Sequence, residues 1–131
     1  MNFTSLRIIT GDIKRLVGFF ETITGLSAQW YTEDFAEIVT ENGTLALGSV
    51  QTMSLFGDGL ITPGVNKSLI IEFRVDNVDD VYERIKNFVS DLVQKPTTMP
   101  WGNRSILFRD PDGNLINFFT PVSPEAIKKF S

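Results

Sequence analysis

The sequence predicts an α+β fold in which two β-α-β-β-β modules form a curved, partly closed mixed sheet around a cavity. Strand-like and helix-like hydrophobic periods follow one another in the same order in both halves of the chain. The two halves also share their helix-start and turn signals. Asp12 and Asn77 each precede a helical pattern, and Gly43 and Gly113 each mark a turn. We interpret the 131 residues as a weak internal duplication within a single domain.

The first module begins with a strand and a helix. Residues 3–9 alternate in the manner of a strand. Asp12 can cap a helix at its start, and Gly25 can end that helix. The apolar residues between these two recur at helical spacing: Ile13, Leu16, Val17, Phe20 and Ile23.

Three short strands complete the first module. Residues 28–32 and 35–41 are rich in aromatic and β-branched side chains. Asn42-Gly43 is a strong hairpin signal, so residues 44–50 are expected to return antiparallel to the preceding strand.

The second module repeats the pattern. Residues 68–75 predict a strand, and Asn77 begins a helix with acidic residues in its first turn. Residues 91–95, 105–109 and 115–120 then predict three further strands.

A Gly- and Pro-containing segment separates the modules, and a short helix follows the second one. Few charges occur in the separating segment, which we interpret as a connection. Ser123-Pro124-Glu125 has a cap, a Pro and an early carboxylate, as a helix start requires. The predicted boundaries are residues 3–50 for the first module, 51–66 for the connection, 67–121 for the second module and 123–130 for the C-terminal helix.

The clearest local signal is the strand-turn-strand pattern of residues 107–121. Pro111 presets the backbone for a turn, and Asp110 and Asp112 can accept hydrogen bonds from nearby backbone N–H groups. Gly113 can supply the positive φ that such a turn needs.

This hairpin also carries a resemblance. FRDPDGNLINFF (residues 108–119) resembles the last hairpin of the glyoxalase/bleomycin-resistance/dioxygenase superfamily, which has the vicinal oxygen chelate fold. ITGDIKRLVGFFETITGL (residues 9–26) resembles the opening strand and helix of that family. The resemblance covers residues 3–121 and implies paired modules around a ligand cavity.

The resemblance implies a metal site only in some members, whose ligands come from the first and last strands of each module. Counting along this chain puts Ser5, Leu47, Ile70 and Asn117 at those positions. These side chains do not suit a divalent metal, which prefers carboxylates or imidazoles. We therefore expect neither a metal nor another cofactor.

Composition excludes several other classes. The chain has no Cys and no His, so disulfides, thiolate ligands and imidazole bases are absent. A net charge of −4 disfavours non-specific nucleic-acid binding. Neither a membrane-spanning run nor a signal-peptide pattern is present, so we expect a cytoplasmic protein without a membrane partner.

Charged and aromatic side chains mark the candidate ligand surface. Arg7 and Glu72 could orient a ligand within an apolar pocket, although strand ends often carry such charges toward solvent. The aromatic residues could clamp a flat ligand or could be core or dimer packing. The candidate ligand-binding residues are Ser5, Arg7, Trp30, Phe35, Leu47, Phe56, Ile70, Glu72, Trp101, Arg104 and Asn117.

The favoured hypothesis is a metal-independent protein that binds a small apolar or aromatic molecule and is not an enzyme. One alternative is a metal-independent, lyase- or isomerase-like enzyme in which Glu72 acts as acid or base. Another is an interaction module whose cavity is filled by its own side chains. Open sheet edges predict a homodimer.

Overall fold

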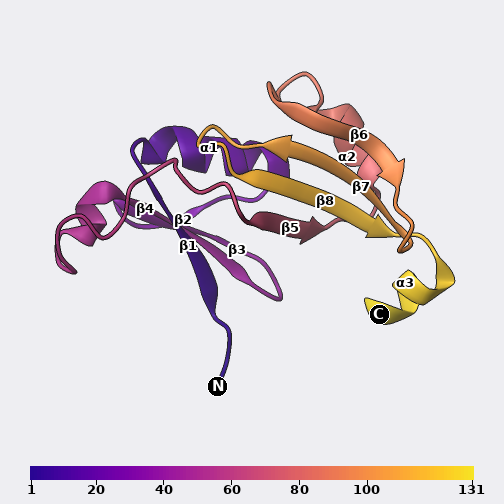
Figure 1. Ribbon diagram of the computed structural model, residues 1–131, viewed down its shortest axis with the longest axis horizontal. Coiled ribbons are helices and arrows are strands. Elements are labelled where there is room, and N and C mark those ends of the chain that lie inside the picture. Colours follow the sequence, from indigo (N-terminus) through magenta and orange to yellow (C-terminus); the bar gives the residue numbers. More distant parts are fainter. The chain divides into compact units, whose positions relative to one another are not determined.

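The computed structural model describes residues 1–131 and divides the chain into two compact units, Met1–Asn66 and Lys67–Ser131. Each unit contains one four-stranded sheet, with strand order β1-β4-β3-β2 in the first and β5-β8-β7-β6 in the second (Figure 1). In both sheets the first strand of the unit is parallel to the last, and the other pairs are antiparallel. The predicted α+β class and the duplicated β-α-β-β-β order are confirmed.

The first unit follows the predicted order of elements, with one short 3₁₀ helix added after the last strand. Its elements are β1 (Ser5–Thr10), α1 (Ile13–Thr24), β2 (Gln29–Thr32), β3 (Phe35–Val39), β4 (Thr44–Ser49) and η1 (Val50–Met53).

Both predicted ends of α1 are confirmed. The Asp12 side chain accepts a hydrogen bond from the Arg15 N–H at 3.2 Å. At the other end Gly25 has φ 73°, and its N–H donates to the Glu21 carbonyl at 2.9 Å. The helix packs on β3 and β4 through the predicted apolar stripe, which also includes Phe19.

The β3–β4 hairpin forms, but its turn differs from the expected type. Neither Asn42 nor Gly43 has a positive φ, so the turn lacks the mirror-image geometry that Asn-Gly favours. Instead the Thr40 N–H and hydroxyl both donate to the Gly43 carbonyl, at 3.0 and 2.6 Å. The Thr40 side chain therefore helps to close this loop, whereas the sequence predicted that Asn42-Gly43 alone would form the turn.

The second unit also keeps the predicted order. Its elements are β5 (Ile70–Arg74), α2 (Val78–Ile85), β6 (Leu92–Thr98), β7 (Asn103–Arg109), β8 (Leu115–Pro121) and α3 (Pro124–Lys129). The predicted caps are present, because Asn77 accepts from the Asp80 N–H and Ser123 accepts from the Ala126 N–H.

Strand β6 is longer than the sequence predicted. It continues through Pro96 to Thr98, whereas the prediction ended at Lys95. The strand lies at the edge of its sheet, and its register with β7 shifts between Gln94 and Thr97. A proline has no N–H to donate, and an irregular edge strand tolerates that loss.

The β7–β8 turn has the predicted construction. Gly113 has φ 87°, and its N–H donates to the Asp110 carbonyl at 3.0 Å. The buried Asp110 carboxylate accepts from the Asp112 N–H at 2.9 Å and from the backbone and side chain of Asn114, each at 2.8 Å. Burial is the main reason why the pKa of Asp110 is raised.

Each unit has its own apolar core. In the second unit the Phe118 ring contacts Phe108 and Phe73 edge-on, with ring centroids 5.2 and 5.4 Å apart. The largest fully buried side chains of the first unit are Phe20, Leu16, Ile23, Ile38 and Leu47. None of the helices combines the length and the apolar character needed to cross a bilayer.

Candidate functional site

The two faces of the first sheet differ in chemistry. Residues that pair in register project from the same face of a sheet. Ile38 pairs with Leu45 and Ala36 pairs with Leu47, and these buried apolar residues form the face on which α1 packs. Arg7 pairs with Ala46, which pairs with Glu37, so Arg7 and Glu37 lie on the face opposite α1.

An aromatic and charged cluster occupies that face. The Arg7 guanidinium carbon lies 5.0 Å from the centre of the Phe35 ring, a cation–π distance. The Phe35 and Tyr31 rings are tilted with centroids 5.9 Å apart. The Tyr31 hydroxyl donates to Gln29 Oε1 at 3.3 Å. The Glu37 carboxylate is the main cause of the raised pKa of Tyr31.

The corresponding face of the second sheet carries a carboxylate–amide pair. Glu72 pairs with Asn117 across β5 and β8, and Asn117 Nδ2 donates to Glu72 Oε2 at 2.8 Å. Asn117 Oδ1 is buried and accepts no hydrogen bond from the protein. Such an orphan acceptor is unusual, because buried polar atoms are nearly always partnered.

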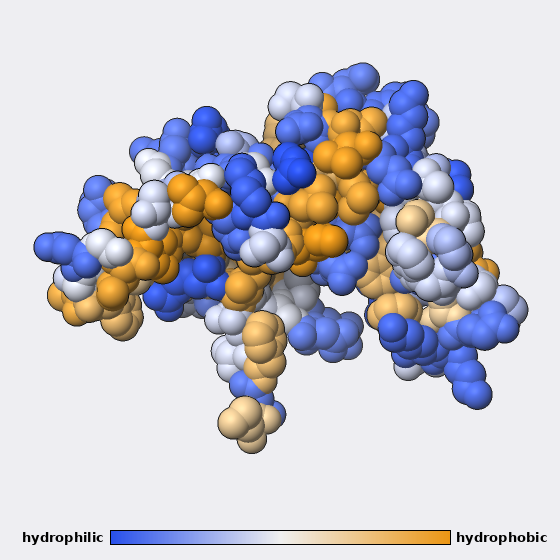
Figure 2. Space-filling model, viewed as in Figure 1, coloured by the Kyte–Doolittle hydropathy of each residue, from blue (hydrophilic) through white to orange (hydrophobic).

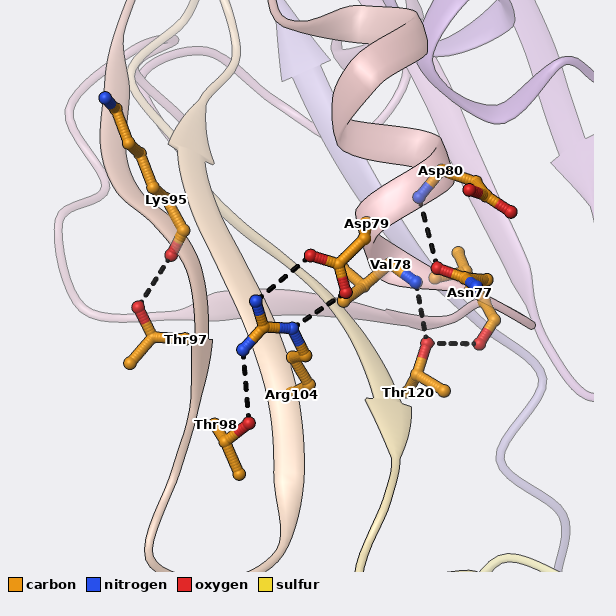
Figure 3. A network of polar contacts seen from close by, with 10 residues as sticks. Asn77, Val78, Asp79, Asp80, Lys95, Thr97, Thr98, Arg104 and Thr120 are labelled. Atoms are coloured by element: carbon orange, nitrogen blue, oxygen red, sulfur yellow. Dashed lines mark hydrogen bonds and ion pairs between the residues drawn. The ribbon is translucent and has the colours of Figure 1, made fainter.

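This face lies opposite α2. Arg104 pairs with Thr120, and both contact α2: Arg104 binds Asp79, and the Thr120 hydroxyl accepts from the Val78 N–H at 3.0 Å (Figure 3). Asn117 is an odd number of residues from Thr120 along β8, so it projects from the other face. The exposed Ile70 is two residues from Glu72 on β5 and projects with it.

The register corrects one position that was counted from the sequence. Ser5 pairs with Thr44 and Ile70 pairs with Leu115, which aligns the first and last strands of the two units. On this alignment the counterpart of Asn117 is Ala46, whereas counting from the turn glycines gave Leu47. The two results differ by one residue because the β3–β4 loop is one residue shorter than the Asp110–Asn114 turn. Leu47 is fully buried on the α1 face.

Arg104 is held on the α2 face. Its Nε and one terminal nitrogen donate to the two Asp79 carboxylate oxygens at 2.7 and 3.0 Å, and the other terminal nitrogen donates to the Thr98 hydroxyl at 3.2 Å (Figure 3). The hydrogen bonds with Arg104 are the main reason why the pKa of Asp79 is lowered. The structure therefore separates Arg104 from Glu72 and Asn117.

The remaining predicted residues are dispersed. Trp30 pairs with Ala36 and so lies on the α1 face, away from Phe35. Phe56 follows η1 in the connection, and Trp101 lies in the turn before β7, with 67% and 64% of their surfaces exposed. Ser5 is exposed on the same face as Arg7.

Sequence reasoning missed Glu37 as a member of the Arg7 cluster. A signal was available, because Glu37 is two residues from Phe35 in a strand and must project from the same face. Tyr31 was also absent from the predicted residues, because only the sheet register distinguishes it from its neighbour Trp30.

The comparisons with known proteins agree with this architecture. Residues 2–118 match the family model described as the Glyoxalase/Bleomycin resistance protein/Dioxygenase superfamily. The chain belongs to this superfamily. Members of known structure share the fold: a glyoxalase/bleomycin resistance protein/dioxygenase family enzyme from Burkholderia phytofirmans superposes with a TM-score of 0.79 at 15% identity, covering 90% of this chain and 97% of that one.

Other relatives are similar over most of their length. The uncharacterized protein YraH of Bacillus subtilis is 26% identical, over 91% of this chain and 98% of that protein. A bleomycin resistance protein of Geobacillus stearothermophilus is 24% identical, over 86% of this chain and 91% of that protein. A virulence protein of Salmonella typhimurium has a TM-score of 0.72 at 27% identity, covering 93% of this chain and 98% of that one.

The four positions at which the resemblance implies metal ligands in some members hold side chains that do not fit a metal. After correction of the register they hold Ser5, Ala46, Ile70 and Asn117, none of which is a carboxylate or an imidazole. In each unit one carboxylate lies beside one of these positions on the neighbouring strand. Glu37 pairs with Ala46, and Glu72 pairs with Asn117. No group of three or more His, Cys, Asp or Glu side chains is placed to bind one ion. This donor set is poorly suited to metal coordination.

Proposed function

We propose that this member of the superfamily binds a small apolar or aromatic molecule without a metal ion and without catalysing a reaction. The observation that carries the proposal is the pairing of Glu72 with Asn117, whose buried Oδ1 has no partner. Turning of the Asn117 side chain would bring this oxygen to a ligand, and an N–H or O–H donated by the ligand would then remove the cost of an unsatisfied acceptor. The carboxylate of Glu72 offers a second acceptor beside it.

In the first unit, the sheet face opposite α1 offers a second candidate surface, which has aromatic character. There the Arg7 guanidinium lies over the Phe35 ring, and the Phe35 ring contacts the Tyr31 ring. Tyr31 is 60% exposed. Aromatic surfaces with a few placed polar groups are typical of small-molecule sites. The relatives named bleomycin resistance proteins further support a role in handling a small organic molecule.

The first experiment is mass spectrometry of the denatured, freshly purified protein to identify any co-purified small molecule. A screen of small aromatic compounds carrying N–H or O–H donors then follows by calorimetry. We expect Asn117→Leu to weaken the best compound about tenfold, the value of one hydrogen bond to a buried acceptor. Arg104→Gln is the matched control, because Arg104 is held on the α2 face.

Two results would contradict the proposal. Affinities that are insensitive to Asn117→Leu, Glu72→Gln and Arg7→Gln alike would place the ligand elsewhere. A compound that the protein converts, with turnover abolished by Glu72→Gln while binding persists, would replace the binding role by the enzyme hypothesis.

We also propose that the chain forms a homodimer. The connection after η1 exposes apolar side chains that a second copy could cover: Leu55, Phe56 and Leu60 have 94%, 67% and 63% of their surfaces exposed. Figure 2 shows this apolar surface in orange where Figure 1 places η1 and the connection. Light scattering should give twice the chain mass of 14.7 kDa, and the Phe56→Ser variant should dissociate.

A control for the dimer is Ile127→Ser, which removes an apolar side chain of α3 that is 53% exposed. This variant should keep the mass of the wild-type protein. A wild-type mass of one chain across micromolar concentrations would contradict the dimer.

A further inference from the structure

A pocket of about 240 Å³ lies between α3 and the turn before β7. Its position depends on the close approach of Gly102 to the start of α3. The Gly102 carbonyl accepts from the Val122 and Ser123 N–H groups at 2.8 and 3.0 Å. A Cβ on Gly102 would lie 2.0 Å from the Ser123 hydroxyl oxygen, so only glycine permits this contact.

The far wall of the pocket is fixed to the sheet. The Phe130 ring lies 5.1 Å from the Phe119 ring, and the Arg74 guanidinium donates to the Phe130 carbonyl. The Lys129 ammonium lies 5.1 Å from the centre of the Phe130 ring. Both ends of α3 are therefore attached, and the hollow beneath it has defined walls.

The lining includes two aromatic residues and one asparagine with an unsatisfied acceptor. Its residues are Trp101, Asn103, Glu125, Ala126, Lys129 and Phe130. Asn103 Oδ1 is buried and accepts no hydrogen bond from the protein. Asn103 itself lines the pocket, and its soft terminal torsion would have to turn for this oxygen to reach a bound molecule.

We propose that this pocket binds a small, neutral, planar ring that carries an N–H donor. Trp101 and Phe130 line the pocket and supply aromatic surface for the ring, and Asn103 Oδ1 accepts the N–H. Glu125 and Lys129 have opposite charges, so the lining as a whole favours neither sign. The volume is below the roughly 300–1,000 Å³ of sites for drug-sized ligands, which selects a ligand of one or two fused rings.

This site is additional to both candidate surfaces proposed above, because its lining includes neither Glu72 and Asn117 nor any residue of the Arg7 cluster. Its ligand is recognised by one buried amide and two rings, without a carboxylate–amide pair. The two sites can therefore be tested and can fail separately.

The test is a titration of the ¹⁵N-labelled full chain with indole and with benzofuran, which has the same shape but no N–H donor. We expect saturable shifts of the Trp101 indole and Asn103 amide signals with indole, and about tenfold weaker binding of benzofuran. Asn103→Leu should abolish the difference between the two probes. Trp101→Ala should weaken indole binding at least tenfold.

The matched control is Trp30→Ala, which removes the other tryptophan of the chain and should leave the indole affinity unchanged. Equal affinities of the two probes for the wild-type protein would overturn the role of Asn103 without any need for a variant. Shifts centred on Asn117, or none at all, would overturn the pocket itself.

Discussion

Replacing Gly113 by Val tests the turn that joins the last two strands. Gly113 has φ 87°, which a β-branched residue adopts only at a cost of about 1–3 kcal/mol. Its new Cβ would lie 2.8 Å from Lys67 Nζ, but that flexible ammonium can move away and adds little. An unfolding entropy of about 2.1 cal/mol/K per residue over 131 residues converts this cost into a fall in Tm of roughly 4–11 °C.

The other turn glycine supplies the control. Gly43 ends the corresponding loop of the first unit and lacks a positive φ, and a Cβ added to it would meet no heavy atom within 4 Å. Gly43→Val should therefore change the free energy of unfolding by less than about 0.5 kcal/mol. Chemical denaturation of both variants measures the difference. Equal losses at the two glycines would refute the argument from backbone conformation.

Three further outcomes are expected, two from substitutions of charged residues and one from metal analysis. Asp110→Ala removes the acceptor of three hydrogen bonds and should lower the free energy of unfolding by about 2–4 kcal/mol in urea denaturation. Arg104→Met should destabilise the protein at neutral pH. Because the pKa of Asp79 is lowered in the folded state, this stabilisation is present above the ordinary pKa of an aspartate and is lost as pH falls through the lowered value, so acid titration should bring variant and wild type together. Elemental analysis should find no stoichiometric Zn, Ni, Mn or Fe, and EDTA should leave Tm unchanged; one retained metal per chain would contradict this expectation.

Local signals in the sequence predicted most of the fold. Asp12 and Gly25 fix the ends of α1 through bonds that span only a few residues, and Gly113 needs only its own backbone conformation. Such features depend on neighbours in the chain, so a single sequence contains them. The division into one cooperative domain remains a prediction that an unfolding transition would test.

The candidate site was less predictable, because it depends on register and on distant partners. A bulge after Trp30 decides which aromatic side chain of β2 joins Phe35, and nothing local indicates it. Asp79 holds Arg104 from a different element. The position assigned to Leu47 belongs to Ala46, because the two turns differ in length by one residue.

The parallel pairing of β1 with β4, and of β5 with β8, predicts an order of assembly for each unit. The β3–β4 and β7–β8 hairpins join residues that are close in the chain, so their closure costs little entropy. Ser5 must find Thr44, and Ile70 must find Leu115, across the whole helix and two strands. We expect β1 and β5 to gain amide protection last during refolding, so that each sheet is completed by its own first strand.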